Sequence, residues 1–215
     1  MDNTRILLVD DDKNLLRVLS YQIRELGFEV TGVSAPREAL KCMEETDFDL
    51  VITDLRMPGM DGLQLLEEVR KIEKDLPVIV LTAHGTIDKA VEAIRRGAYD
   101  FLTKPFESAE VEHSIRNALK LAQLLEENRR LAHAVAEKFK FEGILGTSGK
   151  FQAVISQAQQ LAAVETTVLI QGESGTGKEL IARAIHYNSP RSHHPFVVVN
   201  LSLIHISEPT RPLYI

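Results

Sequence analysis

The sequence has few of the residues that cross-link small proteins or form long apolar segments. It contains one cysteine, Cys42, and no tryptophan, and aromatic residues make up 6% of its 215 positions. A single cysteine excludes a disulfide framework and a zinc site built from cysteines. No run of about 18 apolar residues is present, and the first residues lack the apolar core of a signal peptide. We therefore expect a cytoplasmic protein with no membrane contact.

An excess of positive charge is also lacking. The formal net charge is -6, from 25 Lys and Arg against 31 Asp and Glu. Residues 1–120 carry -7 and residues 121–215 carry +1, so neither part has the basic surface of a nucleic-acid-binding domain. A hydrophobic content of 44% with 26% charged residues excludes a disordered or collagen-like chain. We expect contact with DNA only through regions outside this sequence.

Five short strand patterns alternate with helical patterns in the first half of the chain. The expected strands are 6–10, 29–33, 50–54, 78–82 and 99–103. Three of them are continuous apolar runs, which are typical of parallel strands covered on both faces. The expected helices are 14–26, one that starts at Pro36, 62–71 and 86–96. This alternation predicts an α/β fold, an open and doubly wound parallel sheet.

A long helix is predicted over residues 108–138, which contain no glycine or proline. An apolar seam with one asparagine recurs there at intervals of three and four, in Leu121, Leu124, Asn128, Leu131 and Val135. Such a seam is typical of a two-stranded coiled coil, so we expect residues 121–140 to be a linker that forms a homodimer. The alternative is a helix that covers its own domain with these leucines.

Chemically active side chains are expected at four strand ends of the first half. They are Asp10 and Asp11, Asp54, Thr82 and Lys104. Ligands of open α/β sheets bind outside the carboxyl ends of the strands, so these side chains should converge. Clustered carboxylates raise one another's pKa, and Mg²⁺ relieves this because it prefers oxygen ligands. A carboxylate there can attack a phosphoryl group, with Lys104 and Thr82 stabilising the phosphoryl oxygens. The alternative for the aspartate run is a solvated turn or helix cap.

Residues 1–120 closely resemble the receiver domain of two-component response regulators. The resemblance is carried by ILLVDDD at 6–12, DLRMPGMDG at 54–62, LTA at 81–83 and KPF at 104–106. It implies a flavodoxin-like (βα)5 fold and a phosphoryl group received from a sensor histidine kinase. The implied phosphoacceptor is Asp54.

The same resemblance implies a role for the neighbouring side chains. Asp11 and Asp54, with the backbone carbonyl of Arg56, would bind Mg²⁺ directly, and Asp10 would act through a water molecule. Thr82 and Phe101 match the pair that switches on phosphorylation. The Lys104–Pro105 peptide bond would be cis.

A phosphate loop is predicted at residues 172–178, where GESGTGK matches G-x-x-x-x-G-K. It follows an expected strand, 166–171, and opens an expected helix, 178–187, which is the context that the motif needs. Backbone N–H groups, the helix N-terminus and Lys178 would hold the phosphates of ATP. The predicted ATP-binding residues are Gly172, Glu173, Ser174, Gly175, Thr176, Gly177, Lys178 and Glu179. The alternative is a glycine-rich turn.

Further segments around the loop resemble the AAA+ domain of sigma-54-dependent transcription activators. They are GILGTS at 143–148, GESGTGKE at 172–179, ELIARAIH at 179–186 and PFVVVN at 195–200. A helix at 151–163 and a strand at 196–200 complete the expected elements. The order of receiver, linker and AAA+ segment is similar to the NtrC family. The resemblance implies a phosphorylation-controlled regulator of transcription.

The resemblance ends after Asn200. We therefore expect four parts: a receiver domain at 1–120, the linker at 121–140, the first part of the AAA+ domain at 141–200, and a tail at 201–215. The tail matches nothing in the family and is interpreted as a non-native end of a truncated reading frame, the alternative being a divergent genuine tail.

The family's Walker B acid, sigma-contacting loop, finger arginine and helix-turn-helix are not found in this sequence. We expect weak ATP binding without hydrolysis, and contact with sigma-54 polymerase only through regions outside the sequence. Two alternatives stay open: a receiver that acts as a dimerising adaptor, and a P-loop NTPase in its own right.

Overall fold

The computed structural model describes residues 4–83, 87–144, 146 and 148–199. It divides into two compact units, Met1–Glu127 and Asn128–Ile215, which are treated one at a time. The predicted start of a helix at residue 86, the end of the strand predicted at 196–200, and the tail at 201–215 lie outside the described residues.

The first unit contains a five-stranded parallel sheet. Its strands are β1 (Arg5–Val9), β2 (Glu29–Val33), β3 (Leu50–Asp54), β4 (Val78–Ala83) and β5 (Asp100–Lys104). They are ordered β2-β1-β3-β4-β5, and every neighbouring pair is parallel. This is the flavodoxin-like order, with its switch point between β1 and β3. The predicted α/β fold is confirmed, and the ends of each strand predicted for this unit differ from the observed ends by at most one residue.

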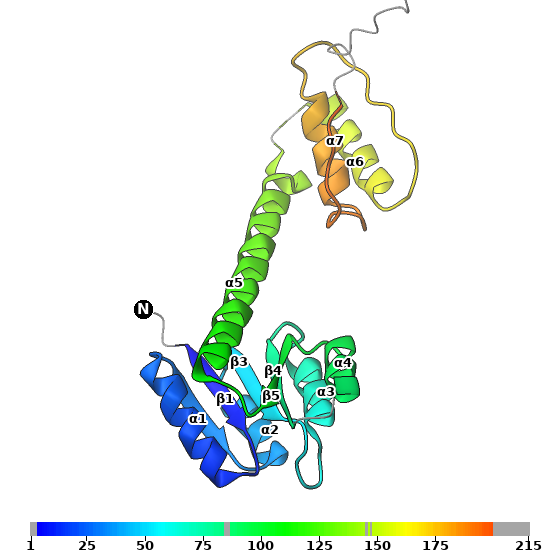
Figure 1. Cartoon of the computed structure of the whole chain (residues 1–215). Helices are drawn as coiled ribbons and strands as arrows, with labels where there is room; N and C mark the ends of the chain where they lie inside the picture. The colour runs from blue at the N-terminus through cyan, green and yellow to red at the C-terminus, as the bar shows by residue number, and fades with distance from the viewer. Residues whose placement is uncertain (1–3, 84–86, 145, 147, 200–215) are drawn as a thin grey trace, which may run out of the picture. The chain divides into compact units, whose positions relative to one another are not determined.

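Helices cover both faces of this sheet (Figure 1). They are α1 (Lys13–Glu25), α2 (Pro36–Glu45), α3 (Gly62–Ile72), α4 (Ile87–Arg95) and α5 (Ser108–Lys138). One buried cluster joins the sheet to α1 and α5, and a second joins it to α2, α3 and α4. All five residues of β3 are buried because both faces are covered, which explains its unbroken apolar sequence.

Polar caps fix the loops that leave the carboxyl ends of the strands. Asp12 Oδ1 accepts hydrogen bonds from the backbone N–H groups of Asn14 (2.9 Å) and Leu15 (3.3 Å) and so starts α1. Asp61 and Gln64 form a reciprocal capping box at the start of α3, with distances of 2.8 and 3.0 Å. Such caps contribute about 1 kcal/mol each and hold the loops around β1 and β3 in place.

Gly62 makes the tightest backbone approach near β3. A Cβ atom at this first residue of α3 would lie 2.2 Å from the backbone oxygen of Asp54. Gly62→Ala should therefore lower the free energy of unfolding by about 1–3 kcal/mol, because the strand end must move. Gly149→Ala, at the first residue of helix α6, is the matched control, since nothing lies within 4 Å there. Equal midpoints in urea for both variants would contradict the prediction.

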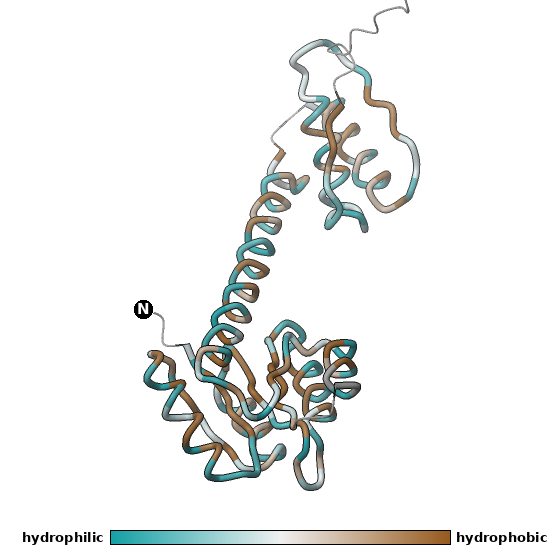
Figure 2. The backbone as a smooth tube through the Cα atoms, viewed as in Figure 1, coloured by the Kyte–Doolittle hydropathy of each residue, from teal (hydrophilic) through white to brown (hydrophobic). Residues whose placement is uncertain are grey.

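Helix α5 has the predicted bounds and changes character along its length. Its first part packs on the sheet through four buried residues, Val111, Ser114, Ile115 and Ala118. The apolar residues of the predicted seam are instead 38–58% exposed, at Leu121, Leu124, Leu131 and Val135. Figure 2 shows brown segments interrupting the mainly hydrophilic later part of the helix. These side chains are largely exposed in the single chain, and both interpretations of the seam stay predictions.

The second unit contains helices but lacks the two strands predicted for it. Its elements are η1 (Phe141–Gly143), α6 (Gly149–Ala162) and α7 (Lys178–Tyr187). Residues 166–171 and 196–199 have no strand structure, so the strand predictions there are wrong over the described residues. The physical reason is that a strand needs a neighbour for its backbone hydrogen bonds, and the sequence pattern does not supply one. Leu169 and Val197 are accordingly 81% and 75% exposed.

Candidate functional site

Lys104 bridges two aspartates at the carboxyl end of the sheet. Its Nζ lies 2.7 Å from Asp10 Oδ2 and also forms an ion pair with Asp54 Oδ1. The three side chains come from the ends of β1, β3 and β5, with β4 between the last two. Their strand-end positions in the sequence predict this convergence, and the structure places Asp10, Asp54 and Lys104 together.

Burial makes the electrostatics of this cluster strong. Asp10 is 1% exposed and Asp54 is 7% exposed. Burial raises the pKa of Asp10 above its usual value, and the neighbouring Asp54 adds to that, although the hydrogen bond from Lys104 partly opposes it. Burial alone would lower the pKa of Lys104, but its hydrogen bonds to both aspartates outweigh this and raise that pKa. The lysine is therefore held protonated between two carboxylates.

Backbone N–H groups orient both carboxylates. Asp54 Oδ2 accepts from the N–H of Arg56 at 2.7 Å, and Asp10 Oδ1 accepts from the N–H of Asp12 at 2.9 Å. Each carboxylate thus uses one oxygen for the backbone and the other for Lys104. This leaves the Asp54 side chain with a fixed direction, which a nucleophile requires.

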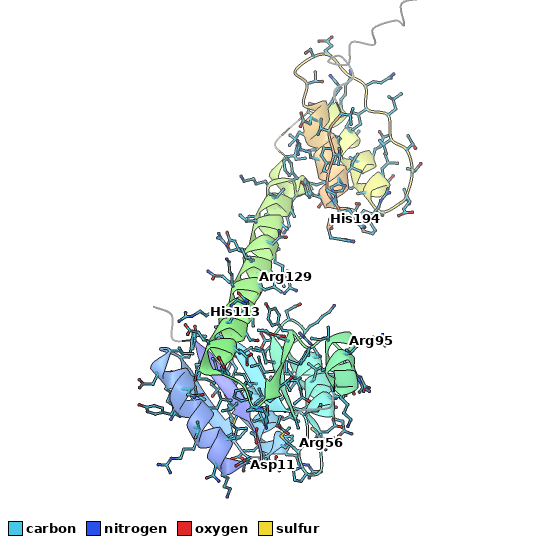
Figure 3. The ribbon with its side chains drawn as sticks, in the orientation of Figure 1. Asp11, Arg56, Arg95, His113, Arg129 and His194 are labelled. Atoms are coloured by element: carbon cyan, nitrogen blue, oxygen red, sulfur yellow. The ribbon has the colours of Figure 1, made fainter. Side chains whose placement is uncertain are left out.

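The other predicted residues differ in their burial. Thr82 is 2% exposed at the end of β4, and Phe101 is half-buried in β5. Asp11 is exposed, and it lies at the same end of the unit as Arg56 (Figure 3). Within the described ranges no three His, Cys, Asp or Glu side chains are spaced to hold a metal. The Lys104–Pro105 peptide bond is cis, as the resemblance implied.

The donor set fits Mg²⁺ chemically. Asp10 and Asp54 supply buried hard oxygen ligands that carry more negative charge than Lys104 neutralises. Asp11 directly follows Asp10 and is exposed, so its carboxylate is not packed in the core. The Arg56 residue lies beside Asp54, as its backbone hydrogen bond shows. Mg²⁺ takes oxygen ligands and keeps several waters, so two or three protein oxygens are enough.

Asp10→Asn should test the cost of this buried charge. Without Mg²⁺, the variant should be more stable than the wild type at pH 7 by roughly 1 kcal/mol, because a buried carboxylate is removed while Lys104 keeps Asp54. The pKa of Asp10 is higher in the folded state than its ordinary value of 3.8. The free-energy cost of burying its carboxylate is therefore absent below pH 3.8, grows as the pH rises toward the folded pKa, and is complete above it.

The gain from Asp10→Asn should therefore shrink as the pH falls toward 4. Urea unfolding in a chelator at pH 7 and pH 4.5 measures this difference. Added Mg²⁺ should stabilise the wild type more than the variant. A gain in stability that is equal at both pH values would contradict the assignment of the penalty to the Asp10 carboxylate.

The phosphate loop in the second unit leads directly into α7. Gly175 and Gly177 have φ values of +80° and +84°, a conformation that favours glycine, and Gly177 precedes the first helical residue, Lys178. Lys178 Nζ donates to the backbone oxygen of Gly172 at 2.9 Å and to that of Glu173. The Thr176 hydroxyl donates to the Glu173 oxygen at 2.8 Å. The lysine thus lies across the loop at the N-terminus of a helix, where anions bind.

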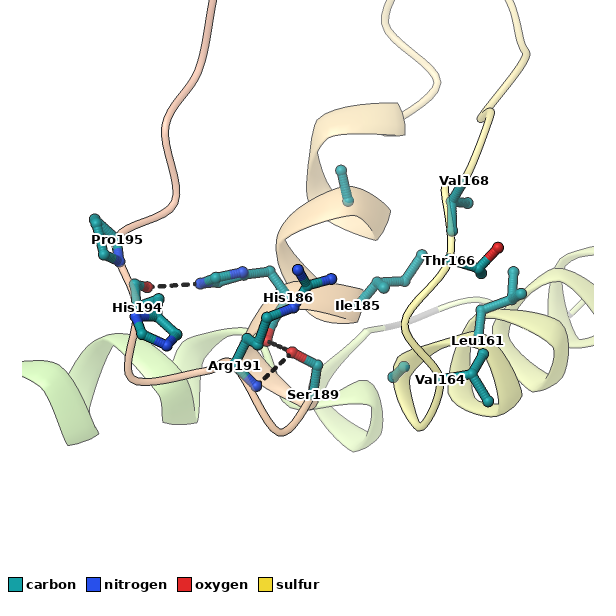
Figure 4. Close-up of a pocket in the computed structure, with 12 residues that line it drawn as sticks. Leu161, Val164, Thr166, Val168, Ile185, His186, Ser189, Arg191, His194 and Pro195 are labelled. Atoms are coloured by element: carbon teal, nitrogen blue, oxygen red, sulfur yellow. Dashed lines mark hydrogen bonds between the residues drawn. The ribbon is translucent and has the colours of Figure 1, made fainter.

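The second unit contains a pocket of about 540 Å³, and Figure 4 shows the residues that line it. Apolar side chains of α6, α7 and residues 164–168 form part of its wall, together with His186, Arg191 and His194. No residue of the phosphate loop lines it. His186 Nε2 forms a hydrogen bond of 2.9 Å with the backbone oxygen of His194 in the wall of this pocket.

Some residues around the loop were missed by sequence reasoning. Arg183 pairs with Glu179, and its guanidinium lies over the rings of Phe139 and Phe196. The spacing of four residues between Glu179 and Arg183 on one helix could have indicated the ion pair. The contacts with the two rings join distant parts of the sequence and leave no local pattern.

Comparisons with known proteins identify the families of both parts of the chain. The model described as the response regulator receiver domain matches residues 6–116, and the sigma-54 interaction domain matches residues 144–208. The chain therefore belongs to the response regulators, with a receiver domain followed by sigma-54 interaction sequence, as the NtrC resemblance indicated. The second match runs past Asn200 to residue 208, and the origin of the tail at 201–215 stays a prediction.

Two curated proteins are similar to most of this chain. The regulatory protein AtoC of Escherichia coli is 42% identical over 93% of this chain, and the C4-dicarboxylate transport regulator DctD of Pseudomonas aeruginosa is 41% identical over 92%. Each match covers 43% of the relative, so this chain spans less than half of their length. The described helices include none that is long and apolar enough to cross a membrane.

Solved structures show the same likeness. NtrX from Brucella abortus, solved in complex with ATP, is 34% identical with a TM-score of 0.61, over 94% of this chain and 44% of that chain. A receiver domain protein from Clostridium thermocellum is 35% identical with a TM-score of 0.55, over 57% of this chain and 98% of that chain.

Proposed function

We propose that Asp54 accepts a phosphoryl group from a sensor histidine kinase, with Mg²⁺ bound beside it. The observation that carries the proposal is the buried cluster of Asp10, Asp54 and Lys104, in which one lysine binds both carboxylates. The membership in the response regulators supports the same reaction. We place this reaction in the cytoplasm.

Each residue of the site has a separate role in the phosphoryl transfer. An oxygen of Asp54 forms the new bond to phosphorus while the bond from phosphorus to the donor's nitrogen or oxygen breaks. The N–H of Arg56 holds the other oxygen and so aims the nucleophile. Lys104 and Thr82 stabilise the phosphoryl oxygens. Asp10, Asp11, Asp54 and the Arg56 carbonyl would hold Mg²⁺, which supplies positive charge to the phosphoryl oxygens when it is bound.

The wild-type chain tests this proposal with a small phosphoryl donor, acetyl phosphate. Intact-mass spectrometry should show one added phosphoryl group in the presence of Mg²⁺ and none after removal of the metal with a chelator. Uptake that is equal with and without Mg²⁺ would contradict the role of the metal. No uptake under either condition would contradict the proposed function.

The whole protein's role extends beyond the receiver domain. We propose that phosphorylation controls a sigma-54-dependent transcription activator, with ATP bound at residues 172–178. The match to the sigma-54 interaction domain and the loop geometry of Lys178 support this. Sigma-54 polymerase and DNA would be contacted through regions outside this sequence. NtrX, a similar protein, binds ATP, which supports nucleotide binding by this chain.

The exposed seam of α5 supports a homodimer through the linker. Leu124 is 58% exposed and Leu131 is 53% exposed on a helix of 31 residues. Leu124→Glu should raise the dimer dissociation constant at least ten-fold, because a charge would be buried at a coiled-coil core position. Gln123→Glu, which adds the same charge at an exposed position outside the seam of the same helix, is the control. Sedimentation that is identical for the wild type and the Leu124 variant would contradict the proposed dimer.

A further inference from the structure

The side chain of Glu179 is bound by Arg183, which lies one turn further along α7. Its Oε1 accepts hydrogen bonds from Arg183 Nε at 2.9 Å and from Nη2 at 2.7 Å. The side chain of Glu179 is 64% exposed and that of Arg183 is 29% exposed. Since Glu179 directly follows Lys178, this pair fixes the direction of the carboxylate that stands closest in sequence to the phosphate-binding lysine.

Arg183 itself is held by aromatic rings. Its guanidinium carbon lies 5.7 Å from the centre of the Phe139 ring and 5.0 Å from that of Phe196. Phe139 is stacked on Tyr187 at 5.2 Å, and its backbone oxygen accepts from Asn188 Nδ2 at 2.9 Å. An exposed i,i+4 ion pair is normally worth little because both side chains are mobile. These rings restrict the arginine, so the pair acts as a fixed element.

An unrestrained carboxylate would interfere with the phosphate loop. A triphosphate bound there carries several negative charges, and the attraction comes from Lys178 and the N-terminus of α7. A free Glu179 side chain could rotate toward the loop, where it would repel the phosphates or pair with Lys178. The observed hydrogen bonds direct its charge toward the next helical turn and neutralise it.

We propose that Arg183 is a positioning residue for nucleotide binding, which holds the Glu179 carboxylate away from the phosphates. Phe139 and Phe196 keep the arginine in place. One precedes the phosphate loop in the sequence and the other follows it, so both segments help to keep the Glu179 charge away from the loop. This inference rests on the proposed binding of ATP at residues 172–178, and it removes Glu179 from the predicted set of residues that contact the phosphates.

Titration of the whole chain with ATP in a chelator tests the proposal without a metal. Arg183→Met should weaken ATP binding on the order of ten-fold, because Glu179 is released. The double variant Arg183→Met with Glu179→Gln should bind within about two-fold of the wild type. Arg191→Met is the matched control, since it removes the same charge from the unit without contact to Glu179.

Each outcome decides between the explanations. A double variant as weak as Arg183→Met alone would overturn the proposal, because the arginine would then act through folding and not through Glu179. An equal loss in Arg191→Met would overturn it in favour of a general charge effect. If Arg183→Met does not fold, Glu179→Gln alone decides: unchanged or tighter binding agrees with the proposal, and weaker binding overturns it.

The same titration separates this inference from the function on which it rests. Wild-type binding that Lys178→Ala abolishes supports the nucleotide site, and the Arg183 variants then test positioning. Wild-type binding no tighter than that of Lys178→Ala would overturn the nucleotide site and the positioning role together.

Discussion

Asp54→Asn is expected to abolish covalent phosphorylation of this chain. The amide nitrogen or oxygen of asparagine is a far weaker nucleophile than a carboxylate, so the loss should be at least about 100-fold and below detection by intact mass. The fold should persist, because an amide oxygen can still accept the hydrogen bond from the Arg56 N–H. Lys104 would keep Asp10 as its ion partner.

Asp47→Asn is the control for this first prediction. Asp47 is an exposed carboxylate of the same unit, outside the strand-end cluster. Its replacement should leave phosphoryl uptake from acetyl phosphate unchanged. Retained uptake in Asp54→Asn would move the phosphoacceptor to another residue and contradict the site described above.

Lys104→Met is expected to slow phosphoryl transfer about 100-fold or more, the usual cost of losing one group that stabilises a developing negative charge. The methionine side chain is similar in length but cannot neutralise phosphoryl oxygens. Mg²⁺ binding should not weaken, since the variant removes a competing positive charge from Asp10 and Asp54. The rate of phosphorylation should therefore fall while the affinity for Mg²⁺ stays the same or rises.

Lys120→Met controls for the loss of one positive charge from the unit. Lys120 is exposed on α5, away from the carboxyl ends of the strands. Phosphorylation rates are followed by intact mass, and Mg²⁺ binding by the metal-dependent shift in the unfolding midpoint. A Lys104→Met protein that is phosphorylated at the wild-type rate would contradict the role of the lysine.

Much of the fold and of the first site could be predicted because the determining patterns are local. The apolar run that forms β3 and the uninterrupted helix α5 have the predicted bounds. Strand-end positions were enough to bring Asp10, Asp54 and Lys104 together, since parallel strands place their carboxyl ends at one edge. The sequence could not show that Lys104 would bind both carboxylates, or that Asp11 would remain exposed.

The second unit was predicted less completely because its structure depends on distant partners. Residues 166–171 and 196–199 have strand-like sequences, yet pairing needs a neighbour that no local pattern specifies. The contacts between Arg183, Phe139 and Phe196 likewise join three separated segments. The helix that follows the phosphate loop was predicted with its observed bounds, because the glycines and Lys178 mark its start.

Chemical mapping of the phosphorylated residue tests the central claim most directly. The wild-type chain is treated with acetyl phosphate and Mg²⁺ and then with borohydride, which reduces an aspartyl phosphate to homoserine. Peptide mass spectrometry then locates the change. The account predicts homoserine at position 54 alone among the strand-end aspartates, and only when donor and metal are both present. Conversion at Asp10 or Asp11 with Asp54 unchanged would contradict it.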